Sequence, residues 1–230
     1  MSAGPLAERF LARAGAAGPW PAAGGVRLHQ RGRMWLRPGG RPLGFTAVQE
    51  IDAGRVAFRW RARFGAGPLR PLAVVDAYDG GEGFLEGRVA GLRAFRSEGP
   101  EVALGEAMRY LAEIAWIPHA LRVNPALEWA ELSASEAELA TATGGGRAAV
   151  RLRVDGAGHL VQASAPDRPR ADRGRAVPTP WRGEFSDHAD LGGLRVPRRA
   201  EAAWELPAGT FTYWRAEVTA LEVVGRAPQR

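Results

Sequence analysis

Only one long stretch of this chain has the residue pattern of a helix, and strand-like segments fill most of the sequence on either side of it. The stretch runs from Gly99 to Ala115, where Gly99 can cap the helix and Pro100 suits its first position. Pro118 ends the pattern, because proline cannot donate the backbone hydrogen bond that a helix needs. Strands that no helices separate do not form a doubly wound parallel sheet. We therefore expect an α+β, mainly antiparallel β fold: one large curved sheet, an open half-barrel, with this helix on its concave face.

The clearest strand pattern lies at residues 55–64, where apolar side chains alternate with arginines. A period of two places the apolar side chains on one face of a sheet and the arginines on the other. We interpret the arginine face as solvated, with an anion-binding stripe as the alternative. Similar segments between turn signals predict strands at 26–36, 43–51, 72–78, 83–89, 91–97, 127–133, 137–142, 148–154, 159–165, 181–188, 194–196, 200–205 and 211–224.

Three segments lie outside the strand pattern. Residues 5–14 predict a short N-terminal helix, and residues 16–25, rich in Gly, Pro and Ala, predict a linker. We therefore divide the chain into an N-terminal helix and linker (1–25) and a single sheet domain (26–230). Residues 166–180 contain Arg, Asp and Pro with almost no apolar side chain, so we interpret them as a long loop, which is often a functional lid.

The composition excludes several kinds of chemistry. The chain has 230 residues, 46% of them hydrophobic, which suffices for the core of one domain. It contains no cysteine, so disulfides, thiolate metal sites and thiol nucleophiles are excluded. The four histidines are scattered, and we expect neither a metal nor a cofactor. The sequence also lacks the motifs of serine hydrolases, phosphate-binding loops and zinc proteases.

The net charge is +6, and all 31 basic residues are arginine. A basic chain ordinarily suggests a nucleic acid partner, but these arginines are interleaved with Asp and Glu along the whole sequence. We therefore do not expect nucleic acid binding. We find no signal peptide and no apolar run of the ~18 residues that a membrane helix requires. A cytoplasmic protein without a membrane span is the expectation, and its oligomeric state is left open.

The predicted helix carries a polar stripe. Successive residues turn by about 100°, so Arg109 and Glu113 lie on the face opposite Leu104 and Met108. One interpretation is a solvated stripe, in which an ion pair contributes a few tenths of a kcal/mol. The other is that the stripe faces the predicted loop and Asp76, an aspartate inside a strand, where it could hold a ligand.

Other polar and aromatic residues are further candidates, each with a plainer structural role. His119 follows the helix end and is either a general base or a packing residue. Most tryptophans are expected to fill the core, although aromatic rings could also line an apolar cavity. We assign no catalytic residue. The candidate ligand-binding residues are Asp76, Tyr78, Arg109, Tyr110, Glu113, Trp116, His119, Arg168, Arg170 and Trp181.

The segment RYLAE followed by W-x-P-x-A-L, at 109–121, is the most specific of several motifs in the chain. Together these motifs resemble an uncharacterised bacterial family, DUF6544, over about residues 6–224. The arginine-bearing strand of the family has a less clear counterpart here, at Arg168 and Arg170. The other matching segments are VVDAYDGGEG (74–83), W-x-G-x-F from Trp181, LRVPRRAEAAW (194–204) and YWRAEV (213–218).

The strand order also resembles the LolA/LppX lipoprotein carriers, whose unclosed antiparallel barrel covers helices and holds acyl chains. This resemblance implies a non-enzymatic module that binds an apolar or amphiphilic, lipid-like small molecule between sheet and helix. Arg109 or the arginines of 166–180 would meet an anionic head group. The alternatives are a small-molecule enzyme that uses Asp76, Arg109 and Glu113, and a protein-interaction domain.

Overall fold

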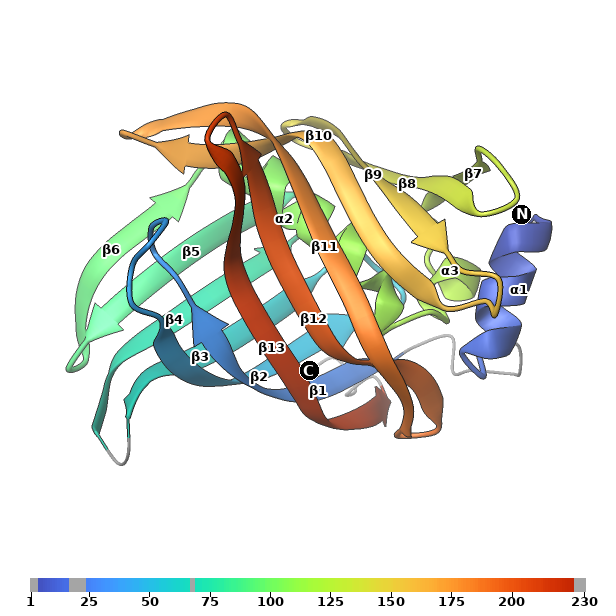
Figure 1. Cartoon of the computed structure of the whole chain (residues 1–230), viewed down its shortest axis with the longest axis horizontal. Helices are drawn as coiled ribbons and strands as arrows, with labels where there is room; N and C mark the ends of the chain where they lie inside the picture. The colour runs from blue at the N-terminus through green and yellow to red at the C-terminus, as the bar shows by residue number, and fades with distance from the viewer. Residues whose placement is uncertain (1–3, 17–23, 67–68, 226–230) are drawn as a thin grey trace.

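A computed structural model describes residues 4–16, 24–66 and 69–225, and strands dominate them. Thirteen antiparallel strands form one sheet in the order β6-β5-β4-β3-β2-β1-β13-β12-β11-β10-β9-β8-β7. Figure 1 shows that this sheet curves strongly around a central helix. The expected fold, a curved antiparallel half-barrel with one long helix on its concave face, is confirmed.

The sheet consists of two arms that follow each other in the sequence. The N-terminal arm contains β1 (Gly24–Met34), β2 (Leu43–Asp52), β3 (Phe58–Ala66), β4 (Leu69–Asp79), β5 (Glu82–Val89) and β6 (Leu92–Glu98). The C-terminal arm contains β7 (Glu128–Glu131), β8 (Glu136–Thr143), β9 (Gly146–Val154), β10 (Leu160–Asp172), β11 (Arg175–Leu191), β12 (Leu194–Leu206) and β13 (Gly209–Gly225). The helices are α1 (Pro5–Arg13), α2 (Pro100–Ala112), the 3-10 turn η1 (Glu113–Ala115) and α3 (Ala120–Val123).

The topology explains why α2 crosses the concave face. Within each arm every strand pairs with its neighbour in the sequence, and β1 pairs with β13 to join the arms at the centre of the sheet. The edge strands are β6 and β7. Because α2 begins after β6 and the chain must reach β7 at the opposite edge, the helix spans the concavity. It packs on β4–β6 of one arm and on β8–β10 of the other (Figure 1).

Local residue choices allow this close packing. Gly99 caps α2 with φ 119°, a conformation that favours glycine, and Pro100 occupies the first turn as predicted. A Cβ on Gly83 of β5 would lie 2.9 Å from the Cα of Ala103, so this strand can approach the helix only because residue 83 has no side chain. The predicted helix at 99–115 is therefore confirmed, with its last turn tightened into η1.

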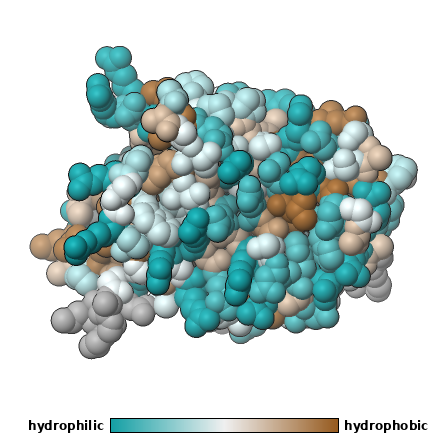
Figure 2. Space-filling model, in the orientation of Figure 1, coloured by the Kyte–Doolittle hydropathy of each residue, from teal (hydrophilic) through white to brown (hydrophobic). Residues whose placement is uncertain are grey.

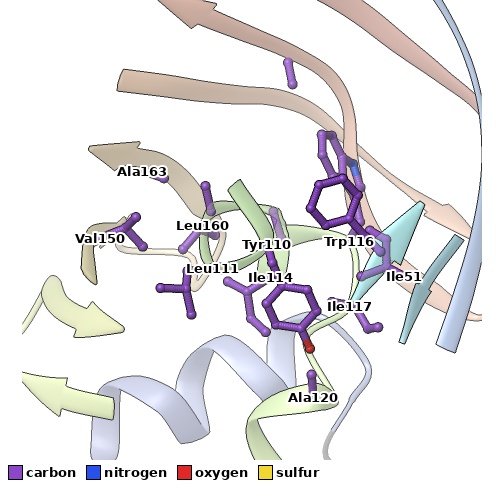
Figure 3. Packing of buried hydrophobic residues seen from close by; sticks show 14 of the residues in the cluster. Ile51, Tyr110, Leu111, Ile114, Trp116, Ile117, Ala120, Val150, Leu160 and Ala163 are labelled. Carbon is purple, nitrogen blue, oxygen red and sulfur yellow. The ribbon is translucent and has the colours of Figure 1, made fainter. Parts of the chain in front are cut away.

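The densest part of the core surrounds the second half of α2. Leu111 and Ile114 are fully buried and lie in one cluster with Val150 and Leu160 of the C-terminal arm (Figure 3). Burying each such side chain stabilises the fold by roughly 1.5–3 kcal/mol. Residues Leu6, Phe10 and Leu11 of α1 belong to the same cluster.

The prediction of a loop at 166–180 is wrong, because this segment is a β-ribbon. Residues 168–172 of β10 pair with 175–179 of β11, with Pro169 opposite Pro178. Pairing of β9 with β10 stops at Ser164, and pairing of β12 with β11 stops at Trp181. The outer edges of the ribbon therefore need no backbone donors, so prolines are tolerated there. The turn has positive φ at Arg173 and Gly174, as in a two-residue hairpin.

Other differences concern element ends, and the two strands predicted at 194–196 and 200–205 form the single strand β12. Strand β3 begins at Phe58, three residues after its predicted start at Arg55. The short helix α3 follows Pro118 and was not predicted. In the predicted linker, Gly24 and Gly25 belong to β1, and residues 17–23 lie outside the described residues.

Candidate functional site

Arg109 of α2 is held by polar side chains from the helix and the N-terminal arm. Its Nη1 lies 2.5 Å from Oδ2 of Asp76 on β4, and its Nε donates to Oε1 of Glu113 at 2.8 Å. Its Nη2 is 3.5 Å from Oε1 of Gln49 on β2. The three charged side chains are only 16%, 11% and 10% exposed. The polar stripe of the helix is thus buried against Asp76, and the solvated interpretation is wrong.

Two glutamines, which the sequence analysis missed, extend this network into the sheet. The Nε2 of Gln49 donates to Oε2 of Glu113, and the Nε2 of Gln30 on β1 donates to Oε1 of Gln49 at 3.3 Å. The indole of Trp60 donates to Oε1 of Gln30 at 2.9 Å. Both glutamines are buried at inward-facing strand positions. A polar residue at an apolar position of the strand period is the signal that could have found them.

Glu106 lies one turn before Arg109 on α2, and its Oε2 is buried without a hydrogen-bond partner. Burial raises the pKa of Glu106 well above its usual range, and the negative charge of Asp76 raises it further. Both effects favour the neutral form of this carboxyl group. Burial opposes the charge of Arg109, but the carboxylates of Glu113 and Asp76 outweigh burial and raise the pKa of its guanidinium. Arg109 is permanently charged and fully paired.

A second buried arginine, Arg168, lies on β10 of the C-terminal arm and is 8% exposed. Its guanidinium carbon is 4.7 Å from the ring centre of Trp181 and 5.8 Å from that of Trp204. Its Nε is buried without a hydrogen-bond partner, and no carboxylate of the described residues is paired with it. The charge of Arg168 still acts on Glu106, where it opposes the rise in pKa.

Tyr110 and Trp116 fix the end of the helix to both arms. The Tyr110 hydroxyl donates to the carbonyl of Asp52 at 2.9 Å and accepts from Nδ2 of Asn124 at 3.1 Å. The indole of Trp116 donates to the carbonyl of Pro197 on β12 at 2.8 Å. The polar atoms of these two candidates are therefore engaged within the fold.

The remaining candidates are spread over the molecule. His119 is 2% exposed, and burial lowers its pKa to about 4, so the ring is neutral at pH 7. Burial raises the pKa of Tyr78 on β4. Arg170 is half-buried on the β10–β11 ribbon. The indole of Trp181 donates to the hydroxyl of Tyr213 at 3.1 Å. The structure thus brings Asp76, Arg109 and Glu113 together and places Arg168 with Trp181 on the opposite arm.

The central strands carry apolar side chains on the concave face. The main packing partners of α2 are β4–β6 and β8–β10, so the inward residues of the central strands pack largely on one another. Their aromatic rings are connected across the arms, since Phe45 lies 5.5 Å from Trp60 and 6.2 Å from Trp214 between ring centres. The registers place small side chains among these rings on the same face: Ala47, Ala62, Gly183, Ala200 and Ala202.

Two surface hollows lie near α1, away from this polar cluster. One is bordered by Phe10, Arg13 and His159, and the other by Leu6 and Glu131. Around Arg109 the space between helix and sheet is occupied by side chains. A ligand on the concave face therefore requires side chains to move apart.

Comparisons with known proteins identify a family and similar folds. The chain matches the model of a family of unknown function, DUF6544, over residues 5–216. No curated protein matches it. Among solved structures, a LolA superfamily protein from Nitrosomonas europaea is similar, with 11% identity, coverage of 97% of this chain and 94% of that chain, and a TM-score of 0.48.

Two further structures give similar values. A putative outer membrane lipoprotein-sorting protein domain from Vibrio parahaemolyticus has 8% identity, coverage of 95% and 90%, and a TM-score of 0.46. A DUF1329 family protein from Desulfovibrio piger has 9% identity, coverage of 98% and 92%, and a TM-score of 0.47. The family resemblance drawn from the sequence is confirmed by the match to the family model. Within the described ranges, none of the helices has the length and apolarity to cross a membrane.

Proposed function

The chain belongs to the DUF6544 family of unknown function, and we propose that it is a non-enzymatic module that binds an apolar or amphiphilic small molecule on its concave face. The observation that carries this proposal is the connected group of inward aromatic rings and alanines on the central strands. Aromatic walls with little side-chain bulk between them are typical of sites for apolar ligands.

The energetics favour a ligand with a hydrocarbon chain. Each buried methylene contributes about 0.8 kcal/mol, so a chain of about ten carbons offsets the loss of ligand freedom and the movement of side chains. An apolar surface is also exposed at the edge of the N-terminal arm. The ring of Phe95 on β6 lies directly over Gly87 of β5 and remains 42% exposed. Gly87 is on the same face of β5 as Gly83, which faces α2, so this ring belongs to the concave side.

The polar cluster gives less support to an enzyme. Asp76, Arg109 and Glu113 pair with one another, and Gln49 occupies a further donor of the guanidinium. Most polar atoms of these three side chains are engaged within the fold, although Oδ1 of Asp76 is buried without a hydrogen-bond partner. We propose no reaction.

A protein-interaction domain is also less favoured. Figure 2 shows hydrophilic residues over most of the visible face, with hydrophobic residues in small separate areas. The large exposed hydrophobic residues are divided among the β5–β6 hairpin, where Val89 pairs with Leu92, and three other places in the chain. A docking surface is usually one contiguous patch. These exposed residues are Leu36, Val89, Leu92, Phe95, Leu132 and Val177.

The test is binding of an uncharged apolar probe, N-phenyl-1-naphthylamine, together with native mass spectrometry of gently purified protein. Ala202→Leu adds bulk to the concave face opposite Trp214 and should weaken probe binding at least tenfold. Ala73→Leu is the matched control, because Ala73 pairs with Arg63 on the outer face of the sheet. A protein that is ligand-free and binds no probe, or equal weakening by both variants, would contradict the proposal.

A further inference from the structure

We propose that Arg168 is the head-group site for this ligand and that the head group is a single carboxylate, as in a long-chain monocarboxylic acid. The inference rests on the proposed function and names the chemical class of its ligand. It stands on the burial of Arg168, on the two rings that hold its guanidinium, and on the missing counter-ion.

Burial without a partner is the first observation. Arg168 is 8% exposed, its Nε has no hydrogen-bond partner, and it forms no ion pair with a carboxylate among residues 4–16, 24–66 and 69–225. Other buried ionisable groups can become neutral by gaining or losing a proton, but a guanidinium stays charged at any physiological pH. A buried permanent charge is disfavoured until an anion contacts it, so the site favours a ligand that supplies one.

The surrounding rings determine how that anion is held. Trp181 and Trp204 lie within 4.7 Å and 5.8 Å of the guanidinium carbon. Rings over the face of a guanidinium stabilise its charge and leave the N–H donors at its edge. Two parallel N–H donors match the two oxygens of a carboxylate. The same rings continue the apolar surface of the concave face, so an acyl chain would extend along them from the head group.

The carboxyl groups near Arg168 in the described part of the chain do not serve as its counter-ion. The charge of Arg168 acts on Glu106, but burial and the neighbouring carboxylate of Asp76 raise the pKa of Glu106 and favour its neutral form. Asp76 itself is 2.5 Å from Arg109. Each nearby carboxyl group is thus neutral or already paired with the other arginine.

The surrounding charges make a dianion a poorer ligand than a monoanion. Asp76 and Glu113 together carry one more negative charge than Arg109 supplies, so with Arg168 the four groups sum to zero before a ligand binds. A second negative charge on the ligand would therefore meet repulsion that a single guanidinium does not offset. A phosphate monoester should bind less well than a carboxylate, and an alcohol should leave the guanidinium without an ionic partner.

The experiment titrates dodecanoate, dodecanol and dodecyl phosphate, each below its micelle concentration, and follows tryptophan fluorescence and calorimetric heat. Three proteins are compared: the wild type, Arg168→Gln and the control Arg182→Gln. Arg182 precedes Gly183 on the same strand as Trp181, but its side chain pairs with Glu205 at the surface. The control therefore removes one equivalent positive charge from the outside.

We expect the wild type and Arg182→Gln to prefer dodecanoate over dodecanol by about 10- to 100-fold, the size expected for a charge-assisted hydrogen bond. Arg168→Gln should lose that preference and still bind dodecanol, which also shows that it is folded. The inference is overturned if Arg168→Gln keeps the preference for dodecanoate. It is also overturned if the wild type binds dodecanol and dodecanoate equally or prefers dodecyl phosphate. Each of these outcomes leaves the proposed function standing. A wild type that binds none of the three ligands overturns both.

Discussion

The two buried arginines of this protein, one on each side of the concave face, meet opposite surroundings. Arg109 has two carboxylates and a glutamine around it, and Phe58 and Trp60 beside it. Arg168 has a similar pair of aromatic neighbours but no anion. Both arginines therefore have two aromatic neighbours, but only Arg109 has carboxylates paired with it. This difference separates a charge that helps to hold the fold from a charge that is available to a ligand.

The comparison also shows how buried charge is avoided elsewhere in the chain. His119 is neutral at pH 7 because burial lowers its pKa to about 4, and burial raises the pKa of Glu106 and favours its neutral form. Both groups can discharge, whereas an arginine cannot. Arg168 is therefore the buried group whose charge has to be met by something outside the described residues.

The largest effect should come from Arg109→Met. This change leaves Asp76 and Glu113 buried without their cation, so we expect a loss of about 3–5 kcal/mol in the free energy of unfolding. Urea denaturation followed by circular dichroism measures it. A loss below about 1 kcal/mol would mean that Arg109 does not hold the fold, and the contrast with Arg168 would disappear.

Acid should destabilise the protein through His119. Because the folded-state pKa of about 4 is below the usual 6.5, the stabilising preference for the neutral ring is present above pH 6.5 and is lost as pH falls to 4. The shift corresponds to about 3 kcal/mol. Denaturation curves of the wild type and His119→Gln between these pH values should show the larger decrease in the wild type. Parallel curves would contradict the buried neutral imidazole.

Glu106→Gln tests whether Glu106 is neutral in the fold and therefore does not pair with Arg168. The raised folded-state pKa means that the carboxyl contributes stability below its usual pKa near 4.5 and loses it as pH rises through the folded-state value. Stability of the wild type should therefore fall relative to Glu106→Gln as pH increases. If the difference were constant over pH 4–9, Glu106 would be ionised in the fold and would itself neutralise Arg168.

The smallest effect should come from Arg168→Met in the ligand-free protein. An apolar side chain of similar length between two indoles removes an unpaired charge, so we expect stability within about 1 kcal/mol of the wild type, or an increase. Thermal unfolding with and without dodecanoate measures it, and the acid should stabilise the wild type more than it stabilises Arg168→Met. A loss as large as that of Arg109→Met would place the partner of Arg168 within the protein.

The sequence predicts local structure better than contacts between the arms. The alternation at 55–64 and the cap at Gly99 predict β3 and α2, because their residue preferences are local. The ribbon at 166–180 was misassigned, since it buries little apolar surface and so has no strand period. The pairing of Arg109 with Asp76 was one of two interpretations, and helical spacing alone could not decide between them. The isolation of Arg168 depends on the curvature of the whole sheet, which no local pattern contains.

The single pairing of β1 with β13 has a consequence for how the protein is made. All other neighbouring strands of the sheet are close in sequence, but Gly24 of β1 lies opposite Gly225 of β13. During synthesis on a ribosome the N-terminal arm, α2 and strands β7–β12 emerge before β13, so the arms cannot join until that strand has left the exit tunnel. Until then β1 is an unpaired edge, and the nascent chain needs protection there from pairing with other chains.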